Sequence, residues 1–544
     1  MTTTGSAPAN AILSWSAGQI LEKIAAGDVS AAEVTEAYLR RIEQVNPLLN
    51  AIVFPMFEQA RAAAAAVDAA RKRGEALGPL AGLPMTVKES FNLAGTPTTA
   101  GLVTRASHRA KADAFHVGRL RGAGAVVLGK TNVPQLLLCN DSQNPLYGRT
   151  KNPWNPERSA GGSSGGEAAA IAAGCSPLGL GSDIGGSLRL PANACGICSL
   201  KPTSGRLTMA GHFDPLPGQA AILAQPGPMA RYVRDLDLLF RFLCTPEQCA
   251  VDPSIPPVPL VTEGAGAAKP LRVGFYVDNG VMRVASAVAR AVREAAAALR
   301  ERGVEVVEWQ PPEMDRAWEL YLGLLMANGS SYLRRLSAGN KKERFLRQTI
   351  LAGWWPNWYL AGLISPLFHA VGQHHLGKTV RCLGRRSTRN YWRLTFERNQ
   401  YRMTFLAAMA ERGCDALLCP VDALPAMQPG RGGDLSNAVS YAALYNLLGM
   451  PAGAVPVTRV RPDEESERPS SFDRVERIAR ATEQGSAGLP IGVQIVARHW
   501  REDVVLRLMQ MVEDDFAQRP DYPAAAAALP VLPTGRSEGL LGTA

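Results

Sequence analysis

Helical and strand-like hydrophobic patterns alternate along most of this chain. Apolar residues recur every three or four positions in 14–46, which predicts two helices, and an alanine-rich helical pattern covers 56–74. Ser30, followed three residues later by Glu33, is typical of a capping box at the second helix. Short apolar runs then follow helical stretches repeatedly, as in HVGRLRGAG–AVVLGKTNVP, EAAAIAAG–SPLGLGSDIGG, VASAVARAVREAAAALRERG–VEVVEW and RMTFLAAMAERG–CDALLCPV. This alternation predicts an α/β protein with a large mixed β-sheet core covered by helices on both faces.

Few stretches depart from this alternation. Those near the two ends of the chain set the expected limits of the domains, and the others are expected to be loops. We expect an N-terminal helical segment at 1–74 and one long domain at 75–515. Within that domain, 256–270 and 461–487 have the composition of loops. Proline and alanine are frequent in a tail at 516–544, which we expect to be loosely ordered.

Composition places the chain among well-packed globular proteins. It has 544 residues, of which 46% are hydrophobic, so it can bury a sizeable core. The net charge of +10 is spread along the chain, and no compact basic and aromatic patch indicates a nucleic-acid partner. Nine cysteines favour a reducing compartment over a disulfide scaffold, so we expect a cytoplasmic protein. The first dozen residues lack the features of a signal peptide or an N-terminal transmembrane helix.

Neither a metal nor a cofactor is expected. Cys195 and Cys198 form a lone CxxC pair, but a zinc site would need a second pair or nearby histidines. We therefore interpret both as buried thiols in a packed turn. The glycine-rich run GGSSGG at 161–166 is not followed by the GK[ST] of a phosphate-binding loop, so no nucleotide site is indicated there.

The same run raises the question of a nucleophilic serine. GGSSGG matches G-x-S-x-G with either Ser163 or Ser164 at its centre, but the preceding TKNPWNPERSA has no strand pattern. A nucleophile elbow needs such a strand, so an α/β-hydrolase is disfavoured. Taken alone, the run is typical of a loop that opens the following helix.

A second glycine-rich turn, DIGGS at 183–187, changes this interpretation. Its glycines can adopt positive φ, and consecutive backbone N–H groups can then gather beside a serine. An acyl-transfer site needs such donors to hold a developing oxyanion. Ser187 is therefore a candidate nucleophile, and the candidate oxyanion donors are the amides of Ile184, Gly185, Gly186 and Ser187.

The candidate base is a lysine rather than a histidine. None of the seven histidines lies in a pattern that suggests a Ser–His pair. Lys88 ends the apolar run 83–87, so its amine can lie in the interior, where burial lowers the pKa of a lysine. A neutral amine there could accept a proton through a relay serine. A lysine at a strand end can equally extend along the surface into solvent.

Taken together, these three features resemble the amidase signature family. Lys88, GGSSGG at 161–166 and DIGGS at 183–187 have the order and spacing of that family, and the run GGSSGGEAAAIAAGCSPLGLGSDIGGSLRLPANACGICSLKPTSGR is long and specific. The resemblance implies the amidase signature fold, with 75–515 as the catalytic domain of an amidohydrolase that cleaves the C–N bond of linear amides.

The resemblance also implies a role for each candidate residue. Ser187 matches the acylated nucleophile, and Lys88 matches the general base. Ser163 matches a relay serine that members of the family hold with a cis peptide bond. Ser164 is then expected to stabilise the loop by hydrogen bonding.

Within this family, the chain most resembles the fatty acid amide hydrolases, through TNVPQLLLCNDSQNPLYGRTKNPW, VSYAALYNLLGMPAGAVPVT and GLPIGVQIVARHW. The resemblance implies hydrolysis of primary fatty amides or N-acylethanolamines, through an acyl-enzyme, and Leu137 as a residue that lines the substrate site. The three leucines 136–138 could equally be ordinary core. Two other functions stay open: hydrolysis of small aliphatic, aryl or peptide amides, and a role as one component of a glutamine-dependent amidotransferase.

A long uncharged stretch favours an amphipathic, lipid-like substrate. No Asp, Glu, Lys or Arg occurs at 348–377, although basic residues flank it on both sides. Prolines make it a poor transmembrane span, whereas two short helices at a membrane surface would suit its tryptophans and basic flanks. We expect an apolar helical cap at about 340–390, with peripheral membrane contact through 348–377. A hairpin packed on the core or in the interface of the expected homodimer is the alternative.

Overall fold

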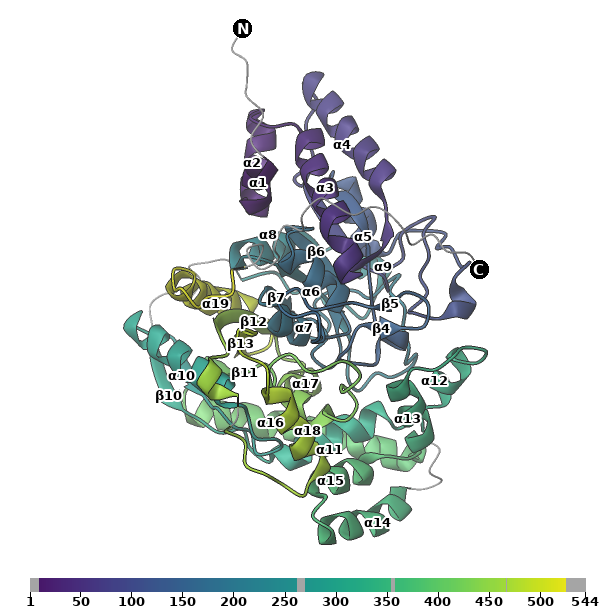
Figure 1. Ribbon diagram of the computed structural model, residues 1–544, viewed down its shortest axis with the longest axis vertical. Helices are drawn as coiled ribbons and strands as arrows, with labels where there is room; N and C mark the ends of the chain where they lie inside the picture. Colours follow the sequence, from purple (N-terminus) through teal and green to yellow (C-terminus); the bar gives the residue numbers. More distant parts are fainter. Residues whose placement is uncertain (1–8, 262–269, 354–357, 466, 525–544) are drawn as a thin grey trace.

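A mixed sheet forms the centre of the molecule. The computed structural model describes residues 9–261, 270–353, 358–465 and 467–524 (Figure 1). Within them, eleven strands are hydrogen-bonded in the order β1 (Ile52–Pro55), β3 (Val126–Thr131), β2 (Pro84–Lys88), β6 (Leu178–Asp183), β8 (Gln225–Ala230), β7 (Cys198–Lys201), β12 (Ala452–Arg459), β13 (Pro490–Ala497), β11 (Ala416–Pro420), β9 (Arg272–Phe275) and β10 (Glu305–Glu308). β2 pairs in parallel with β3 and β6, and β9 with β10 and β11, while the other pairs are antiparallel. The predicted α/β class with a large mixed sheet is confirmed.

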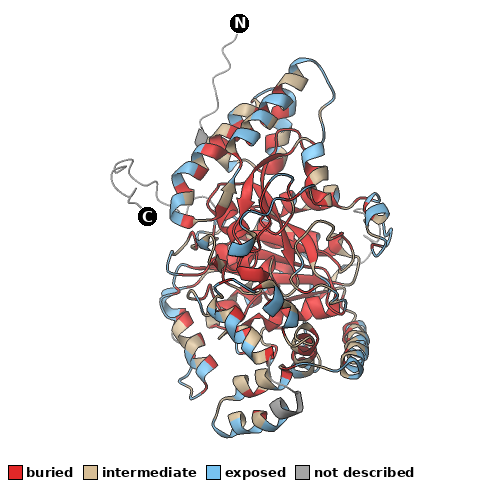
Figure 2. Cartoon of the chain, turned by 90° about the vertical axis from the view of Figure 1, so that its right-hand side faces the viewer, coloured by how far each residue is buried: buried red, intermediate tan, exposed pale blue. Residues whose placement is uncertain are grey.

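Helices cover both faces of this sheet. α6 (Gly165–Ala172) and α7 (Arg189–Cys195) contact each other, and α7 packs on β12 and β13. α19 (Glu502–Phe516) packs on the same two strands but contacts α8 (Val233–Leu243) and α10 (Ser286–Glu301) instead. The two groups therefore lie on opposite faces. Figure 2 shows the buried residues concentrated between these layers, with exposed residues on the outer helices.

The N-terminal segment combines helices with one strand of the main sheet. Its helices are α1 (Ala9–Ser14), α2 (Ala17–Ala26), α3 (Ala31–Leu49) and α4 (Phe57–Lys72). Ser30 caps α3 in a reciprocal capping box with Glu33, as the sequence predicts. β1 lies between α3 and α4 and pairs with β3, so the segment 1–74 is not purely helical: it supplies an edge strand.

One predicted loop is partly wrong. The region 461–487 contains a short 3-10 helix, η4 (Pro462–Glu464), and α18 (Arg474–Glu483). Asp473 caps α18 by accepting a hydrogen bond from the Val475 N–H at 2.8 Å. Val475, Ala479 and Thr482 are buried at helical spacing, a stripe that the many charged neighbours conceal in the sequence. Of the other loop and tail predictions, 262–269 and 525–544 lie outside the described residues.

The region expected to be a cap consists of three helices. They are α13 (Arg344–Gly353), α14 (Trp358–Ala370) and α15 (His374–Cys382), and they are flanked by α11 (Met314–Leu325), α12 (Ser331–Leu336) and α16 (Thr388–Glu411). Residues 354–357 of the uncharged stretch lie outside the described part. α14 packs on α15, and α15 packs on α11. In Figure 1, α14 lies at the end of the molecule farthest from the N-terminal helices.

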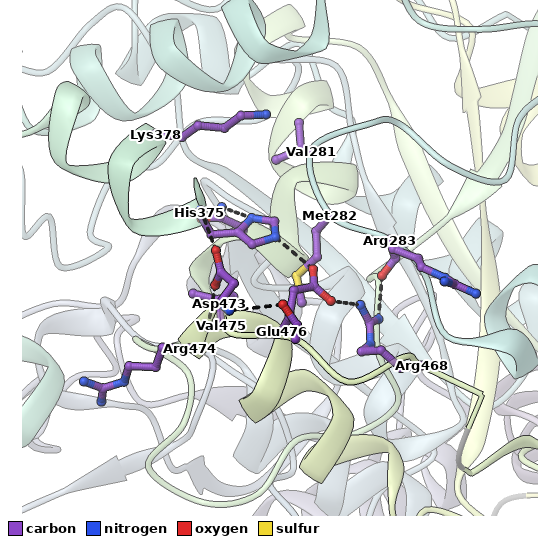
Figure 3. Close-up of polar contacts among 12 residues, drawn as sticks. Val281, Met282, Arg283, His375, Lys378, Arg468, Asp473, Arg474, Val475 and Glu476 are labelled. Atoms are coloured by element: carbon purple, nitrogen blue, oxygen red, sulfur yellow. Dashed lines mark hydrogen bonds and ion pairs between the residues drawn. The ribbon is translucent and has the colours of Figure 1, made fainter. Parts of the chain in front are cut away.

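A cluster of hydrogen-bonded polar side chains connects this cap to α18 and the loop that precedes it (Figure 3). His375 Nε2 lies 2.8 Å from a Glu476 carboxylate oxygen, and the His375 N–H donates to Asp473 at 3.0 Å. Arg468 donates to the other Glu476 oxygen at 2.7 Å and to the Arg283 carbonyl at 2.6 Å. α15 is therefore joined to the domain by hydrogen bonds to two carboxylates as well as by packing.

The remaining elements are short: η1 (Val103–Arg105), α5 (Phe115–Gly122), η2 (Gln135–Leu137), α9 (Gln248–Val251), η3 (Ser436–Val439), α17 (Ser440–Leu448) and a separate pair of strands, β4 (Gln143–Asn144) and β5 (Gly148–Arg149). Both cysteines of the CxxC pair are buried free thiols, as expected. In the part of the chain that the structure describes, no helix is both long and apolar enough to cross a membrane.

Candidate active site

The candidate base lies at the end of a central strand. Lys88 is the last residue of β2, and Ser182 and Asp183 end the adjacent parallel strand β6. Because the carboxyl ends of parallel strands meet at the same edge, these side chains come together. Lys88 is fully buried, with an exposed fraction of 0%, so it does not extend into solvent.

Among the described residues, the groups at hydrogen-bonding distance from Lys88 are all uncharged. Its Nζ lies 2.7 Å from Ser163 Oγ, 3.0 Å from Ser182 Oγ and 3.3 Å from the Ser182 carbonyl oxygen. Burial lowers the pKa of Lys88 to about 7, although the carboxylates of Asp183 and Glu167 oppose this shift. Near neutral pH, a large fraction of the protein therefore holds this amine uncharged.

Ser163 reaches Lys88 from the loop that opens α6. The Gly162–Ser163 peptide bond is cis, the conformation that the family resemblance implies. The next residue ties this loop to its neighbours: the Ser164 N–H donates to the Ser187 carbonyl at 3.2 Å, and Ser164 Oγ donates to the Ser182 carbonyl at 3.3 Å. Ser164 thus links the two glycine-rich turns.

A buried ion pair holds the turn that carries Ser187. Arg189 donates to both Asp183 carboxylate oxygens, each at 3.1 Å, and both side chains are fully buried. The same carboxylate accepts from the N–H groups of Gly186 at 2.7 Å and Leu188 at 3.1 Å. Burial alone would raise the pKa of Asp183, but Arg189 holds it below its ordinary value. Asp183 thus stays charged and fixes the backbone around Ser187.

These contacts engage one of the four candidate oxyanion donors and leave the other three without a protein acceptor among the described residues. The Gly186 amide is engaged by Asp183, whereas the amides of Ile184, Gly185 and Ser187 donate to no protein acceptor among the described residues. A Cβ at Gly185 would lie 2.1 Å from the Tyr321 hydroxyl oxygen, so any larger residue here would have to displace that side chain. Three of the four predicted amides remain free to bind a developing oxyanion.

A cavity of about 330 Å³ opens beside these groups. It is lined by Ser163 and Ser187 and, for the most part, by apolar side chains, which include Leu137, Leu207, Met209, Phe213, Leu216 and Ile222. A second cavity of about 120 Å³ shares Ser187 and Leu137 with the first and extends toward Trp318 and Tyr321 of α11 and Phe345 of α13. Ser187 therefore lines two mainly apolar cavities.

The three consecutive leucines have different environments. Leu137 and Leu138 line both cavities. Leu136 is fully buried in a core cluster with Leu102, Leu216, Leu333 and Leu346. One leucine of this short turn thus belongs to the core and the next two line the cavities, and Leu136 and Leu137 both have positive φ.

Sequence reasoning missed two polar residues of this site. Ser182 contacts Lys88 directly, and His212 Nε2 lies 2.9 Å from Ser182 Oγ and 2.9 Å from Ser90 Oγ. The position of Ser182 on β6, next to DIGGS, is a local signal that could have identified it. His212 has no such signal, because 30 and 122 residues separate it from its two partners. Among the described residues, no group of three or more His, Cys, Asp or Glu is arranged to hold a metal ion.

Comparison with known proteins assigns the chain that carries this site to a family. The model of the family named Amidase matches residues 33–506. The chain belongs to the amidase family. This amidase is an amide hydrolase.

Similar proteins of this family include fatty acid amide hydrolases. Fatty-acid amide hydrolase 1 of Sus scrofa is 35% identical over 500 residues, which cover 91% of this chain and 84% of that protein. Fatty acid amide hydrolase 1 of Caenorhabditis elegans is 33% identical and covers 91% and 87%. A solved structure of a fatty acid amide hydrolase superposes with a TM-score of 0.81 at 26% identity and covers 94% of this amidase and 86% of that chain.

Proposed function

We propose that this amidase hydrolyses fatty acid amides, such as primary fatty amides or N-acylethanolamines, to a free fatty acid and an amine. The observation that carries the proposal is that Ser187 lines two cavities with mainly apolar walls. Such walls suit an acyl chain, because burying apolar surface contributes roughly 25 cal/mol per Å². The similarity to fatty acid amide hydrolases supports the same substrate class.

Acylation begins at Ser187. Its Oγ attacks the carbonyl carbon of the amide, while its proton passes to Ser163 and the proton of Ser163 passes to neutral Lys88. The 2.7 Å contact between Lys88 and Ser163 supports the second of these transfers. The free amides of Ile184, Gly185 and Ser187 receive the negative charge that develops on the carbonyl oxygen, and each such donor is worth about 3–4 kcal/mol of barrier.

The same groups return the proton in the second half of acylation. Protonated Lys88 gives a proton to Ser163, and Ser163 gives its own to the departing nitrogen as the C–N bond breaks. Protonating the nitrogen matters because an amine anion is a poor leaving group. Water then attacks the acyl-enzyme, with Lys88 and Ser163 again accepting and returning a proton, and the fatty acid is released.

Substrate delivery is the part of the proposal that involves the cap. Leu363, Leu367 and Val371 in and just after α14 have exposed fractions of 70%, 65% and 68%. Phe472, whose carbonyl accepts from Gln373, is 91% exposed. A contiguous apolar surface of this kind favours contact with a membrane, where its exposed area would be buried. We propose that the cap contacts membrane and that amides enter from there.

The test compares chain lengths. We expect the purified protein to hydrolyse a long-chain primary amide and an N-acylethanolamine with a much higher kcat/KM than a short-chain aliphatic amide, and liposomes to increase the difference. Ser187→Ala is the control for contaminating activity. Preference for the short-chain amide would favour a small-amide hydrolase, and activity that requires an ATP-using partner would favour a component of an amidotransferase.

A further inference from the structure

We infer that His212 is a positioning residue that orients the amine of Lys88 through the hydroxyl of Ser182. The inference rests on the proposed function, because it concerns how Lys88 is prepared to accept a proton. His212 lines the larger cavity together with Ser163, Ser182 and Ser187.

The three groups form a short chain of contacts. Lys88 Nζ lies 3.0 Å from Ser182 Oγ, and Ser182 Oγ lies 2.9 Å from His212 Nε2. His212 is itself held in place, since its Nε2 also lies 2.9 Å from Ser90 Oγ and its ring packs edge-on against Phe91 at 4.6 Å between centroids. The imidazole therefore has one defined position relative to Ser182.

The number of hydrogens on each group shows how these contacts orient the Lys88 amine. A neutral lysine amine has two N–H donors and one lone pair, and Lys88 has three neighbouring oxygens. The Ser182 carbonyl can only accept, so it takes one N–H. If Ser182 Oγ accepts the second N–H, the lone pair is left for the O–H of Ser163, which is the arrangement that proton transfer needs.

Ser182 Oγ accepts reliably only if its own hydrogen is directed elsewhere. His212 Nε2 supplies the acceptor, provided that the ring carries its hydrogen on Nδ1. In that tautomer the hydroxyls of Ser90 and Ser182 share the single lone pair of Nε2, from which each oxygen lies 2.9 Å. Without His212, the hydroxyl of Ser182 would turn toward Lys88 and donate to the lone pair, in competition with Ser163.

Burial is the main reason that the His212 ring is neutral. Burial, and then the positive charge of nearby Lys88, hold the pKa of His212 well below its ordinary value. The charged groups that act on Lys88 are Asp183 and Glu167. Burial, the larger cause for His212, persists when Lys88 loses its charge, so the ring stays neutral in both protonation states of Lys88.

The same orientation serves protonated Lys88. Its three N–H groups then find three acceptors, namely Ser163 Oγ, Ser182 Oγ and the Ser182 carbonyl, and Ser182 still donates to His212. No hydroxyl other than that of Ser163 has to turn when Lys88 gains or loses a proton. His212 therefore limits reorganisation around the base during each turnover.

The test measures the rate at which a fluorophosphonate labels Ser187, followed by mass spectrometry as a function of pH. We expect His212→Leu to slow labelling at the plateau by about tenfold to a hundredfold, the range for a lost hydrogen bond to an ionisable group. The acid limb, set in the wild type by a Lys88 pKa of about 7, should move to lower pH, because the freed Ser182 hydroxyl favours the neutral amine. Loosened packing would instead hydrate Lys88 and move the limb to higher pH.

Three further variants complete the experiment. His212→Gln, whose side-chain oxygen can accept from Ser182, should restore most of the rate. Ser182→Ala should slow labelling, and adding His212→Leu to it should slow labelling no further, because His212 acts through Ser182. His116→Leu makes the same change at a buried histidine of α5 outside the cavity and should leave the rate unchanged.

Several outcomes would overturn the inference. A wild-type rate and acid limb in His212→Leu would do so, as would additive losses in the double variant or a loss that His212→Gln does not restore. Melting temperatures of all variants show whether slow labelling reflects unfolding. Absence of labelling at Ser187 in the wild type is a different failure, because it removes the proposed function itself.

Discussion

The floor of the active site and the apolar cap differ in their exposure to water: polar groups are buried in the first, and apolar side chains are exposed in the second. Lys88 and Ser163 are buried, and the amine of one lies at hydrogen-bonding distance from the hydroxyl of the other. α14 instead leaves leucines in solvent, where exposed apolar surface costs roughly 25 cal/mol per Å². The comparison shows two uses of apolar surroundings in one protein. In the active site, the exclusion of water lowers the pKa of the base. In the cap, exposed apolar surface lies where, in the proposed function, a membrane would cover it.

The largest effect is expected at the nucleophile. Ser187→Ala removes the oxygen that forms the acyl-enzyme in the proposed function, so kcat should fall by roughly 10⁴-fold or more. The melting temperature should change little, because Ser187 is only partly buried. Steady-state hydrolysis of a long-chain amide measures the first effect and calorimetry the second. Undiminished turnover would place the nucleophile elsewhere, with Ser164 as the next candidate.

The next effect separates burial from catalysis. Lys88→Met should lower kcat by about 10²- to 10⁴-fold, the usual range for a lost general acid–base. Lys201 is a matched control: it is also fully buried, with a pKa lowered to about 7 by burial, but its Nζ donates to the Pro202 carbonyl at 2.8 Å.

Lys201→Met should therefore keep a near-normal kcat per folded molecule, whatever it costs in stability. The comparison uses active-site titration to count folded enzyme. Equal losses of kcat in the two variants would mean that the interior tolerates no such change, and would remove this support for Lys88 as the base.

A smaller effect is expected in the cap. Leu363→Glu combined with Leu367→Glu puts charge on the apolar face of α14, so hydrolysis of a long-chain amide in liposomes should fall by roughly tenfold. Hydrolysis of a short-chain amide in buffer should not change. Leu48→Glu, which changes an exposed leucine of α3 outside the cap, is the control. If the double variant still binds liposomes normally, the cap does not contact membrane.

The smallest effect concerns how the cap is held. Burial alone would raise the pKa of Glu476, but His375 and Arg468 lower it to about 2. Its contribution to stability is therefore complete above about 4.5 and is lost as pH falls toward 2. Glu476→Gln should lower the free energy of unfolding by about 1–3 kcal/mol at neutral pH and much less at acid pH. Urea titrations at several pH values measure this, and a pH-independent loss would contradict the account.

The contrast between the two regions also shows what sequence can predict. The strand ending at Lys88, the capped start of α3 and the two serine turns follow from short patterns, because their causes lie within a few residues. His212 could not be predicted, since its role depends on Ser90 and Ser182, which only the folded sheet brings together. α18 was missed because charged residues conceal its apolar stripe.

The central claim is that burial lowers the pKa of Lys88 far enough for a large fraction of the resting enzyme to hold this amine uncharged at neutral pH. NMR titration of the ε-carbon signals of ¹³C-lysine-labelled protein tests it directly, with Lys88→Met to assign the resonance. The account predicts a midpoint near 7, where burial places the pKa of this amine. A midpoint near the ordinary lysine value of 10.5 would contradict the account, because a base already protonated cannot accept the proton of Ser163.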